Sequence, residues 1–179
     1  KPLLADKNPV LDVLAGAVPI DQYACFFQSF ADLVTIIDTA ETNGTPILRL
    51  LDERSEDARS RSRYEYQLCM KLDDTARLLG PKVIKTVAFT GSDPFFRTGT
   101  DLAVLFTAEN PVVLAGLLAA QHQKALLTRA NVKRETGTIL GTQYSGVRSP
   151  DRRTCSYLCT AGDVVIVTNS ISQLERILA

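Results

Sequence analysis

The second half of the chain contains six short strand-like segments with only tight turns and one helix between them. They cover residues 83–90, 101–107, 132–140, 143–149, 153–160 and 163–168. The connections are rich in Gly, Pro, Ser and Asp, the residues that form tight turns. Strands joined in this way pair antiparallel. The chain therefore predicts a mainly antiparallel sheet of about five to seven strands, with helices packed on one face, in an α+β fold.

Two of these segments are apolar at every position rather than at alternate ones. They are Leu102–Phe106 and Val164–Val167. A strand that is apolar on both faces is buried on both faces, so we expect these two at the centre of the sheet. A long helix is predicted after Asn110-Pro111, reaching about Ala130. A final helix begins at Ser170, where Gln173 completes a capping-box pattern.

The first 82 residues form a mostly helical part, preceding a sheet-rich part over residues 83–179. Here the patterns predict a helix over 9–18, a strand over 21–27, a helix from Ser29 to Asn43-Gly44, another from Thr45-Pro46, and a short helix from Asp73 or Asp74 to Leu79, with Gly80-Pro81 as its stop. The charged run over 52–63 reads as a solvated face or exposed loop, and the alternative is that Arg59, Arg61 and Arg63 within it bind a phosphate. We expect both parts to share one core in a single domain over residues 1–179.

The two ends of the sequence suggest a piece of something longer. The chain begins at Lys1 without Met and stops at Ala179 inside a helical pattern. We therefore expect a processed chain or a fragment of a larger protein. The best apolar run, Pro111–Ala120, has about half of the ~20 residues that a membrane-spanning helix needs, so no membrane insertion is expected within this segment.

Charge is balanced over the chain. It carries 20 Lys and Arg against 20 Asp and Glu. Nucleic-acid binders usually have a strong positive excess, so no nucleic-acid partner is expected. The hydrophobic content of 45% and the charged content of 22% are those of a globular protein and exclude a mainly disordered chain.

The four cysteines are Cys25, Cys69, Cys155 and Cys159. Cys155 and Cys159 lie four residues apart on one predicted strand, or ~13 Å, too far for a disulfide or a shared metal ion. We expect the thiols to be small buried hydrophobes, and the pairing of Cys25 with Cys69 stays open. A redox role for Cys155 or Cys159 would need an exposed thiolate of lowered pKa.

Catalytic and cofactor motifs are missing from the sequence. The single histidine, His122, has polar neighbours that place it on the outer face of its helix. One histidine supports no multi-histidine metal site, and there is no Gly-x-Ser-x-Gly, Walker or Gly-x-Gly-x-x-Gly motif. We therefore expect no cofactor and no metal, and no catalytic residue is assigned.

Two polar loops carry the candidate ligand-binding residues. Asp93, Arg97 and Asp101 belong to the connection between the first two sheet strands, and Arg148 and Arg152 surround a later hairpin. If the loops share one end of the sheet, these side chains form a recognition surface for an anionic or sugar-like ligand, because arginine binds carboxylates and phosphates in bidentate fashion. The alternative is that the same residues only form turns and solvate them.

Three segments share one pattern. Each runs from a turn Asp through an apolar strand to a polar cap and an apolar helix, starting at Asp21, Asp101 and Asp163. Duplication of a strand–helix unit would produce this pattern. So would the ordinary composition of any strand-to-helix transition.

The stretch from Val87 to Leu178 resembles a group of bacterial proteins of unknown function, often predicted to be exported or associated with the cell envelope. The resemblance rests on VAFTGSDPFFRTGTDLAVLF, YSGVRSPDRR and DVVIVTNSISQLERIL. It covers about half of the chain, and its motifs mark turns and the ends of strands and helices rather than a chemical site. The resemblance implies the α+β fold and an exported or envelope location, and it implies no activity.

Two functional hypotheses follow from the sequence. The first is a non-catalytic binding or architectural module of a larger bacterial protein, with the rest of the parent chain or another protein as its partner. The second is a small-molecule-binding or hydrolytic domain that uses the loops over 93–101 and 148–153. The second requires a concave pocket between these loops, whereas the first does not.

Overall fold

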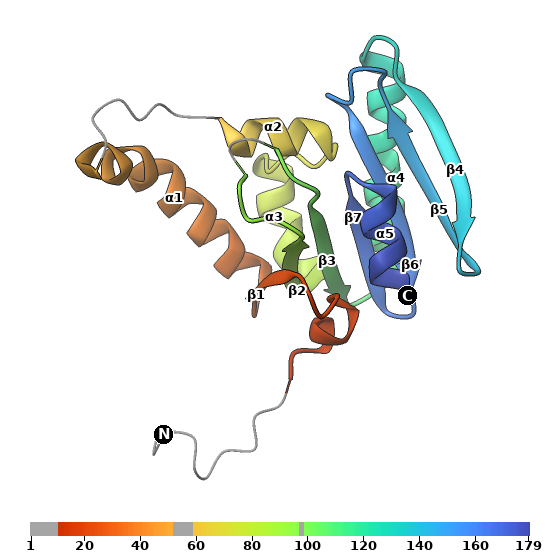
Figure 1. The fold of residues 1–179 in the computed structure, drawn as a ribbon, viewed down its shortest axis with the longest axis horizontal. Helices are drawn as coiled ribbons and strands as arrows, with labels where there is room; N and C mark the ends of the chain where they lie inside the picture. Colours follow the sequence, from red (N-terminus) through yellow and green to blue (C-terminus); the bar gives the residue numbers. More distant parts are fainter. Residues whose placement is uncertain (1–10, 52–58, 97–98) are drawn as a thin grey trace.

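One seven-stranded sheet runs through the centre of the protein (Figure 1). The structure is a computed structural model that describes residues 11–51, 59–96 and 99–179. The strands are β1 (Tyr23–Phe27), β2 (Ile84–Gly91), β3 (Ala103–Ala108), β4 (Lys133–Ile139), β5 (Thr142–Arg148), β6 (Cys155–Ala161) and β7 (Val164–Thr168). They lie in the order β1-β2-β3-β7-β6-β5-β4, and every neighbouring pair is antiparallel. The predicted α+β class is confirmed.

Helices cover both faces of this sheet. They are α1 (Phe30–Leu51), α2 (Ser60–Gln67), α3 (Asp74–Val83), α4 (Pro111–Thr128), α5 (Ile171–Leu178) and the 3-10 helix η2 (Val13–Ala17). Figure 1 shows α3 and α4 behind the sheet, α1 beside it at the left, and α5 in front of β6 and β7; Phe30 and Leu33 of α1 pack in the same cluster as Leu114 of α4. We call these two sides the helix-rich face and the α5 face.

Side chains of the central strands alternate between two cores. On the helix-rich face, Val104 and Phe106 of β3 join a buried cluster with residues of α1, α2 and α4. On the α5 face, Leu105 of β3 and Ile166 of β7, both fully buried, pack with Leu174 of α5. Burying one such side chain stabilises the fold by about 2 kcal/mol.

The prediction that helices lie on one face only is wrong. The all-apolar strands β3 and β7 present hydrophobic side chains on both sides, so both sides need cover. The α5 face receives it from α5 and from Leu14 of η2. The central position predicted for β3 and β7 is confirmed, since the two strands pair with each other from Ala103↔Thr168 to Thr107↔Val164.

The helix predicted to end at Asn43-Gly44 instead continues as α1 through to Leu51. The side chains of Thr42 and Asn43 donate to the carbonyls of Asp38 and Thr39, at 2.8 and 3.2 Å. These bonds stay within the helix, so the polar residues read as a stop are accommodated inside it.

The predicted stop at Gly80-Pro81 is also wrong, because α3 reaches Val83 and leads directly into β2. A Cβ atom on Gly80 would lie 2.3 Å from Cε1 of Phe30. Glycine is therefore needed there for the close approach of α3 to α1 rather than to end the helix. The predicted cap is correct, since the Asp73 side chain accepts from the Ala76 amide.

The N-terminal part joins the sheet as well as the helices. Strand β1 pairs with β2 from Tyr23↔Gly91 to Phe27↔Val87. The helix predicted over 9–18 is a 3-10 helix over Val13–Ala17, capped by Asp12 at 2.9 Å, and Asn8-Pro9 lies outside the described residues. Among the described helices, none combines the length and apolarity needed to cross a membrane.

The three segments that share a sequence pattern are all strand–helix transitions. Side chains of Ser29, Asn110 and Ser170 accept hydrogen bonds from first-turn amides of α1, α4 and α5. However, α1 and α4 pack on the helix-rich face, whereas α5 packs on the opposite face. Copies of one duplicated strand–helix unit would place their helices on the same face of the sheet. The difference therefore favours the interpretation that the shared sequence pattern is the ordinary composition of a strand-to-helix transition.

Candidate functional site

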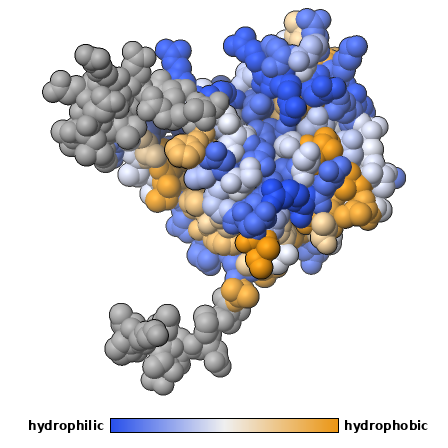
Figure 2. All heavy atoms as spheres, in the orientation of Figure 1, coloured by the Kyte–Doolittle hydropathy of each residue, from blue (hydrophilic) through white to orange (hydrophobic). Residues whose placement is uncertain are grey.

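A polar pocket lies at the end of the sheet where β3 and β6 begin and β7 ends. Its volume is about 370 Å³, and it is lined by Arg63, Tyr64, Gln67, Gly99, Thr100, Asp101, Arg152, Asn169 and Ser170. We call it the α2–α5 pocket, because its walls come from α2, from the two polar loops and from the cap of α5. The surface over the β5–β6 turn, at the top of Figure 2, is mostly hydrophilic.

Of the predicted site residues, Asp101 and Arg152 line this pocket. Asp93 does not, and its carboxylate accepts from the Phe95 amide at 2.8 Å in a local turn. Arg97 lies outside the described residues.

Arg148 is also absent from the pocket lining. It ends β5 opposite Cys155, and its Nε donates to Glu135 on β4 at 2.5 Å. The other carboxylate oxygen of Glu135 accepts from the Tyr157 hydroxyl at 2.9 Å. Arg148 therefore belongs to a separate cross-strand group over β4, β5 and β6.

Asn169 forms the floor of the α2–α5 pocket. Its side-chain oxygen accepts from the Leu102 amide at 2.9 Å, and its nitrogen donates to Gln67 and to the Thr100 carbonyl, each at 3.0 Å. Gln67 in turn donates to the Arg152 carbonyl at 3.0 Å. The floor thus joins α2, both loops and β7 into one hydrogen-bonded unit.

The turn between β5 and β6 holds Arg152 in place. Asp151 accepts from the Ser149 hydroxyl at 2.6 Å and from the Arg153 amide at 3.1 Å. Arg152 itself has a φ of 56°, in the left-handed region. Its Nη2 donates to the Asn169 carbonyl at 3.3 Å, which leaves further guanidinium N–H groups for a ligand.

Asp101 is ionised at neutral pH. Burial acts to raise the pKa of Asp101, but hydrogen bonds from Ser92 and Thr100 outweigh burial and lower it below its ordinary value. Ser92 donates its amide and hydroxyl to Oδ1 at 3.0 and 2.6 Å, and the Thr100 hydroxyl donates at 3.1 Å. This oxygen is therefore occupied by the loop's own donors.

Arg63 supplies the second cation of the pocket. Its guanidinium lies 5.1 Å from the centre of the Tyr64 ring, and Nη2 donates to the Phe96 carbonyl. The Tyr64 hydroxyl accepts from the Thr100 amide at 3.0 Å. Two arginines against one aspartate leave one net positive charge in the lining.

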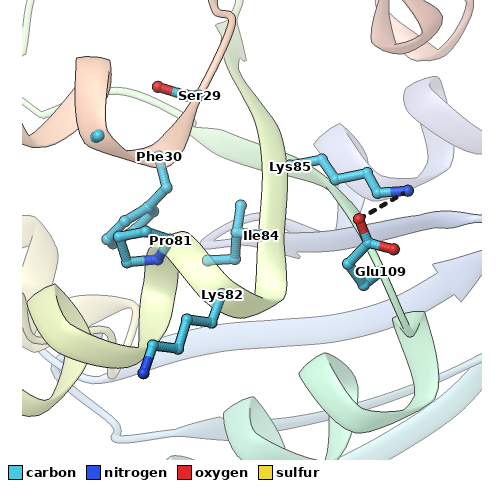
Figure 3. Close-up of a pocket in the computed structure, with 8 residues that line it drawn as sticks. Ser29, Phe30, Pro81, Lys82, Ile84, Lys85 and Glu109 are labelled. Carbon is cyan, nitrogen blue, oxygen red and sulfur yellow. Dashed lines mark ion pairs between the residues drawn. The ribbon is translucent and has the colours of Figure 1, made fainter.

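A second, smaller pocket of about 230 Å³ lies beside the start of α1 and the end of α3. Figure 3 shows Phe30, Pro81 and Ile84 close together in it and Lys85 directed toward Glu109. The lysine and the glutamate are 3.2 Å apart, so their charges neutralise each other. Besides this ion pair, the polar residues that line the pocket are Ser29 and Lys82.

His122 is buried at 6% exposure, which contradicts its predicted place on the outer face of α4. Its Nε2 lies 2.8 Å from the Ser156 hydroxyl, which donates to the Leu68 carbonyl at 2.8 Å. His122 therefore donates from Nε2 to Ser156. The burial of His122 could have been predicted from helical spacing, because residues 114, 118, 122 and 125 lie on one side of the helix, the side of the buried Leu114.

This serine–histidine pair is structural. A nucleophilic serine needs access to substrate and a histidine that accepts its proton. Ser156 is fully buried, and its proton points to Leu68 instead. Burial, and next the charge of Arg129, lower the pKa of His122 to about 4, so the imidazole is neutral in the folded protein at neutral pH.

Arg129 holds α2 against α4 and β6. Its Nη1 donates to the Tyr66 carbonyl at 2.7 Å, the Thr154 hydroxyl at 2.9 Å and the Cys69 sulfur at 3.3 Å. The guanidinium also lies 3.8 Å from the centre of the Tyr66 ring. Because α2 provides Arg63, Tyr64 and Gln67, this contact positions one wall of the α2–α5 pocket.

All four cysteines are free thiols. Cys25 is exposed, while Cys69, Cys155 and Cys159 are buried as small hydrophobes. Burial raises the pKa of Cys159 to about 11. Because Cys155 and Cys159 are both buried, neither offers the exposed thiol that redox work would require.

Within the described residues, no cluster of three or more His, Cys, Asp or Glu side chains is arranged to hold a metal ion. The α2–α5 pocket presents arginine, amide and hydroxyl groups over a hydrogen-bonded floor. Comparison of the chain with models of protein families, with curated proteins and with solved structures gives no match.

Proposed function

We propose that this domain is a non-catalytic binding module whose α2–α5 pocket receives the carboxylate or phosphate group of its ligand. The observation that carries the proposal is the meeting of Arg63, from α2, and Arg152, from the β5–β6 turn, in one pocket of about 370 Å³. Arginine binds such anions through paired N–H groups. The net positive charge of the lining favours an anion over a cation.

The rigid floor supports binding with little rearrangement. Asn169 is 5% exposed and connects Gln67, Thr100 and Leu102. Groups that are already ordered lose little conformational entropy when a ligand arrives. The cap of α5 adds to the attraction, since Ser170 lines the pocket and the amino end of a helix carries partial positive charge.

A binding role fits the pocket better than hydrolysis. The lowered pKa of Asp101 makes its carboxylate a weak general base. The Ser170 hydroxyl accepts from the Gln173 amide at 3.3 Å as a helix cap. The anion belongs either to a small molecule or to a partner segment of the parent chain or another protein, and the recognition chemistry is the same.

The test is titration of the protein with inorganic phosphate and with acetate, followed by amide NMR shifts. We expect saturable shifts at Thr100, Asn169 and Ser170. Arg152→Gln removes one charged contact and should raise the Kd for the anion at least tenfold, equivalent to about 1.4 kcal/mol.

Arg153→Gln is the matched control, because Arg153 is exposed on the same turn and does not line the pocket. Equal weakening by both substitutions would mean general charge attraction and would contradict a specific site. So would saturating anion concentrations that leave these three amides unmoved.

A further inference from the structure

Strand β4 forms one edge of the sheet. In the part of the chain that the structure describes, no strand pairs with its outer side. Its register with β5 runs without interruption from Lys133↔Arg148 to Ile139↔Thr142. The strand has no proline and no bulge, two of the features by which edge strands avoid further pairing. Its unpaired N–H and C=O groups are a template for another strand.

The charges on β4 lie in one half of the strand. Lys133, Arg134 and Glu135 are followed by the uncharged Thr136, Gly137, Thr138 and Ile139. A second β4, placed antiparallel around a two-fold axis at Thr136, would set the charged half of each copy against the uncharged half of the other. Like charges directly opposite each other destabilise a strand pair, and this arrangement has none.

We propose that β4 pairs with β4 of a second copy of this chain, centred on Thr136, to give one continuous antiparallel sheet through both copies. The pairs are Thr136 with itself, Glu135 with Gly137, Arg134 with Thr138, and Lys133 with Ile139. Paired residues of antiparallel strands point to the same face, so the α5 faces of both copies lie on one side. Such an isologous contact is the commonest kind in homodimers.

The neighbouring residues agree with this register. Leu140 follows β4 and is an apolar side chain that is 71% exposed. In the paired arrangement it meets Val132 of the second copy. The two Glu135 side chains approach only diagonally, and each already has its own Arg148 partner at 2.5 Å. In this register each Glu135 carboxylate therefore keeps a positively charged partner.

The first test measures association of the whole chain by sedimentation equilibrium. We expect a concentration-dependent dimer. Thr136→Lys and Thr136→Glu each place two like charges together on the axis, and each should raise the dimer Kd at least tenfold. An equimolar mixture of the two variants should dimerise again, because Lys then faces Glu.

Ser145→Lys is the matched control, because exposed Ser145 pairs with Thr136 but lies on β5, away from the edge. It should dimerise like the unaltered protein. A protein that stays monomeric at millimolar concentration would overturn the proposal, as would a dimer that Thr136→Lys leaves unchanged. Circular dichroism confirms that each variant is folded.

A second test fixes the register. In a Cys25→Ser background, Thr136→Cys brings two thiols together across the axis, at a Cα separation of about 5 Å that suits a disulfide. Mild oxidation should link the copies efficiently. Thr138→Cys faces Arg134 instead and should not link. Preferential linking through Thr138→Cys would overturn the register and with it the proposal.

Discussion

Buried polar side chains in this protein are held by specific partners. Gln22 and Gln173 exchange two hydrogen bonds at 2.6 and 2.5 Å, and Thr90 donates to Gln22 at 2.9 Å. Gln173 is fully buried, so this contact ties α5 to the segment before β1 without leaving an unsatisfied amide. An unpaired amide there would cost about 1–3 kcal/mol.

Tyr23 is an exception among the described residues, because its buried hydroxyl has no hydrogen-bond partner. Tyr23→Phe should therefore leave the free energy of unfolding unchanged or raise it slightly. Tyr64→Phe should lower it by about 1 kcal/mol, because the Thr100 amide loses its acceptor. Urea denaturation of the two variants measures both effects, and a larger loss for Tyr23→Phe would contradict the assignment.

His122 makes stability depend on pH. The pKa of this imidazole is about 4 in the folded protein against an ordinary value of 6.5. As pH falls from about 6.5 to about 4, the unfolded chain takes up the proton first. The stability contributed by the neutral imidazole is thus complete above this window and is lost through it, by about 3 kcal/mol.

Denaturation of the unaltered protein and of His122→Gln between pH 7 and pH 4 tests this dependence. Glutamine can still donate to Ser156 but does not titrate. The pH profile of the variant should be flatter across the window. Parallel profiles would show that other groups carry the acid sensitivity.

At the level of elements, two helical glycines have opposite roles. Gly80 lies under the Phe30 ring where α3 meets α1, whereas a Cβ on Gly116 of α4 would meet nothing within 4 Å. Gly80→Ala should destabilise the protein by about 1–3 kcal/mol through overpacking. Gly116→Ala should stabilise it by about 0.5–1 kcal/mol, because alanine favours the helix. Thermal and urea unfolding distinguish the two, and changes of the same sign would contradict this view of α3.

Strand and helix boundaries were predictable where turn chemistry marks them. All six strands of the second half and the caps at Ser29, Asp73, Asn110 and Ser170 follow from sequence. The helix boundaries predicted at Gly44, Pro46 and Gly80 were wrong, because glycine and proline end some helices and are tolerated inside others. What decides is packing, such as the Phe30 ring on Gly80, and packing is a property of the assembled fold.

Across the whole molecule, the sequence predicted two of the nine residues that line the candidate site, Asp101 and Arg152. Asp101 and Arg152 meet because the start of β3, the start of β6 and the end of β7 share one end of the sheet. The sequence offers Arg63 of α2 only within a charged run that reads as a solvated surface. The contacts that hold α2 against the sheet, from Arg129 and through Gln67, depend on the assembled fold. Arg148 lies outside the pocket, because strand alternation directs its side chain toward Glu135, with which it pairs.

The pairing of β3 with β7 also governs how the chain reaches its fold. Strands β4 to β7 form a meander in which each strand contacts its neighbour in sequence. By contrast, the hydrogen bond from Leu102 to Asn169, beside the β3–β7 pair, spans 67 positions. Non-local contacts form slowly, since loop entropy is lost before they contribute energy. We therefore expect folding to start in the meander and closure of this long loop to limit its rate.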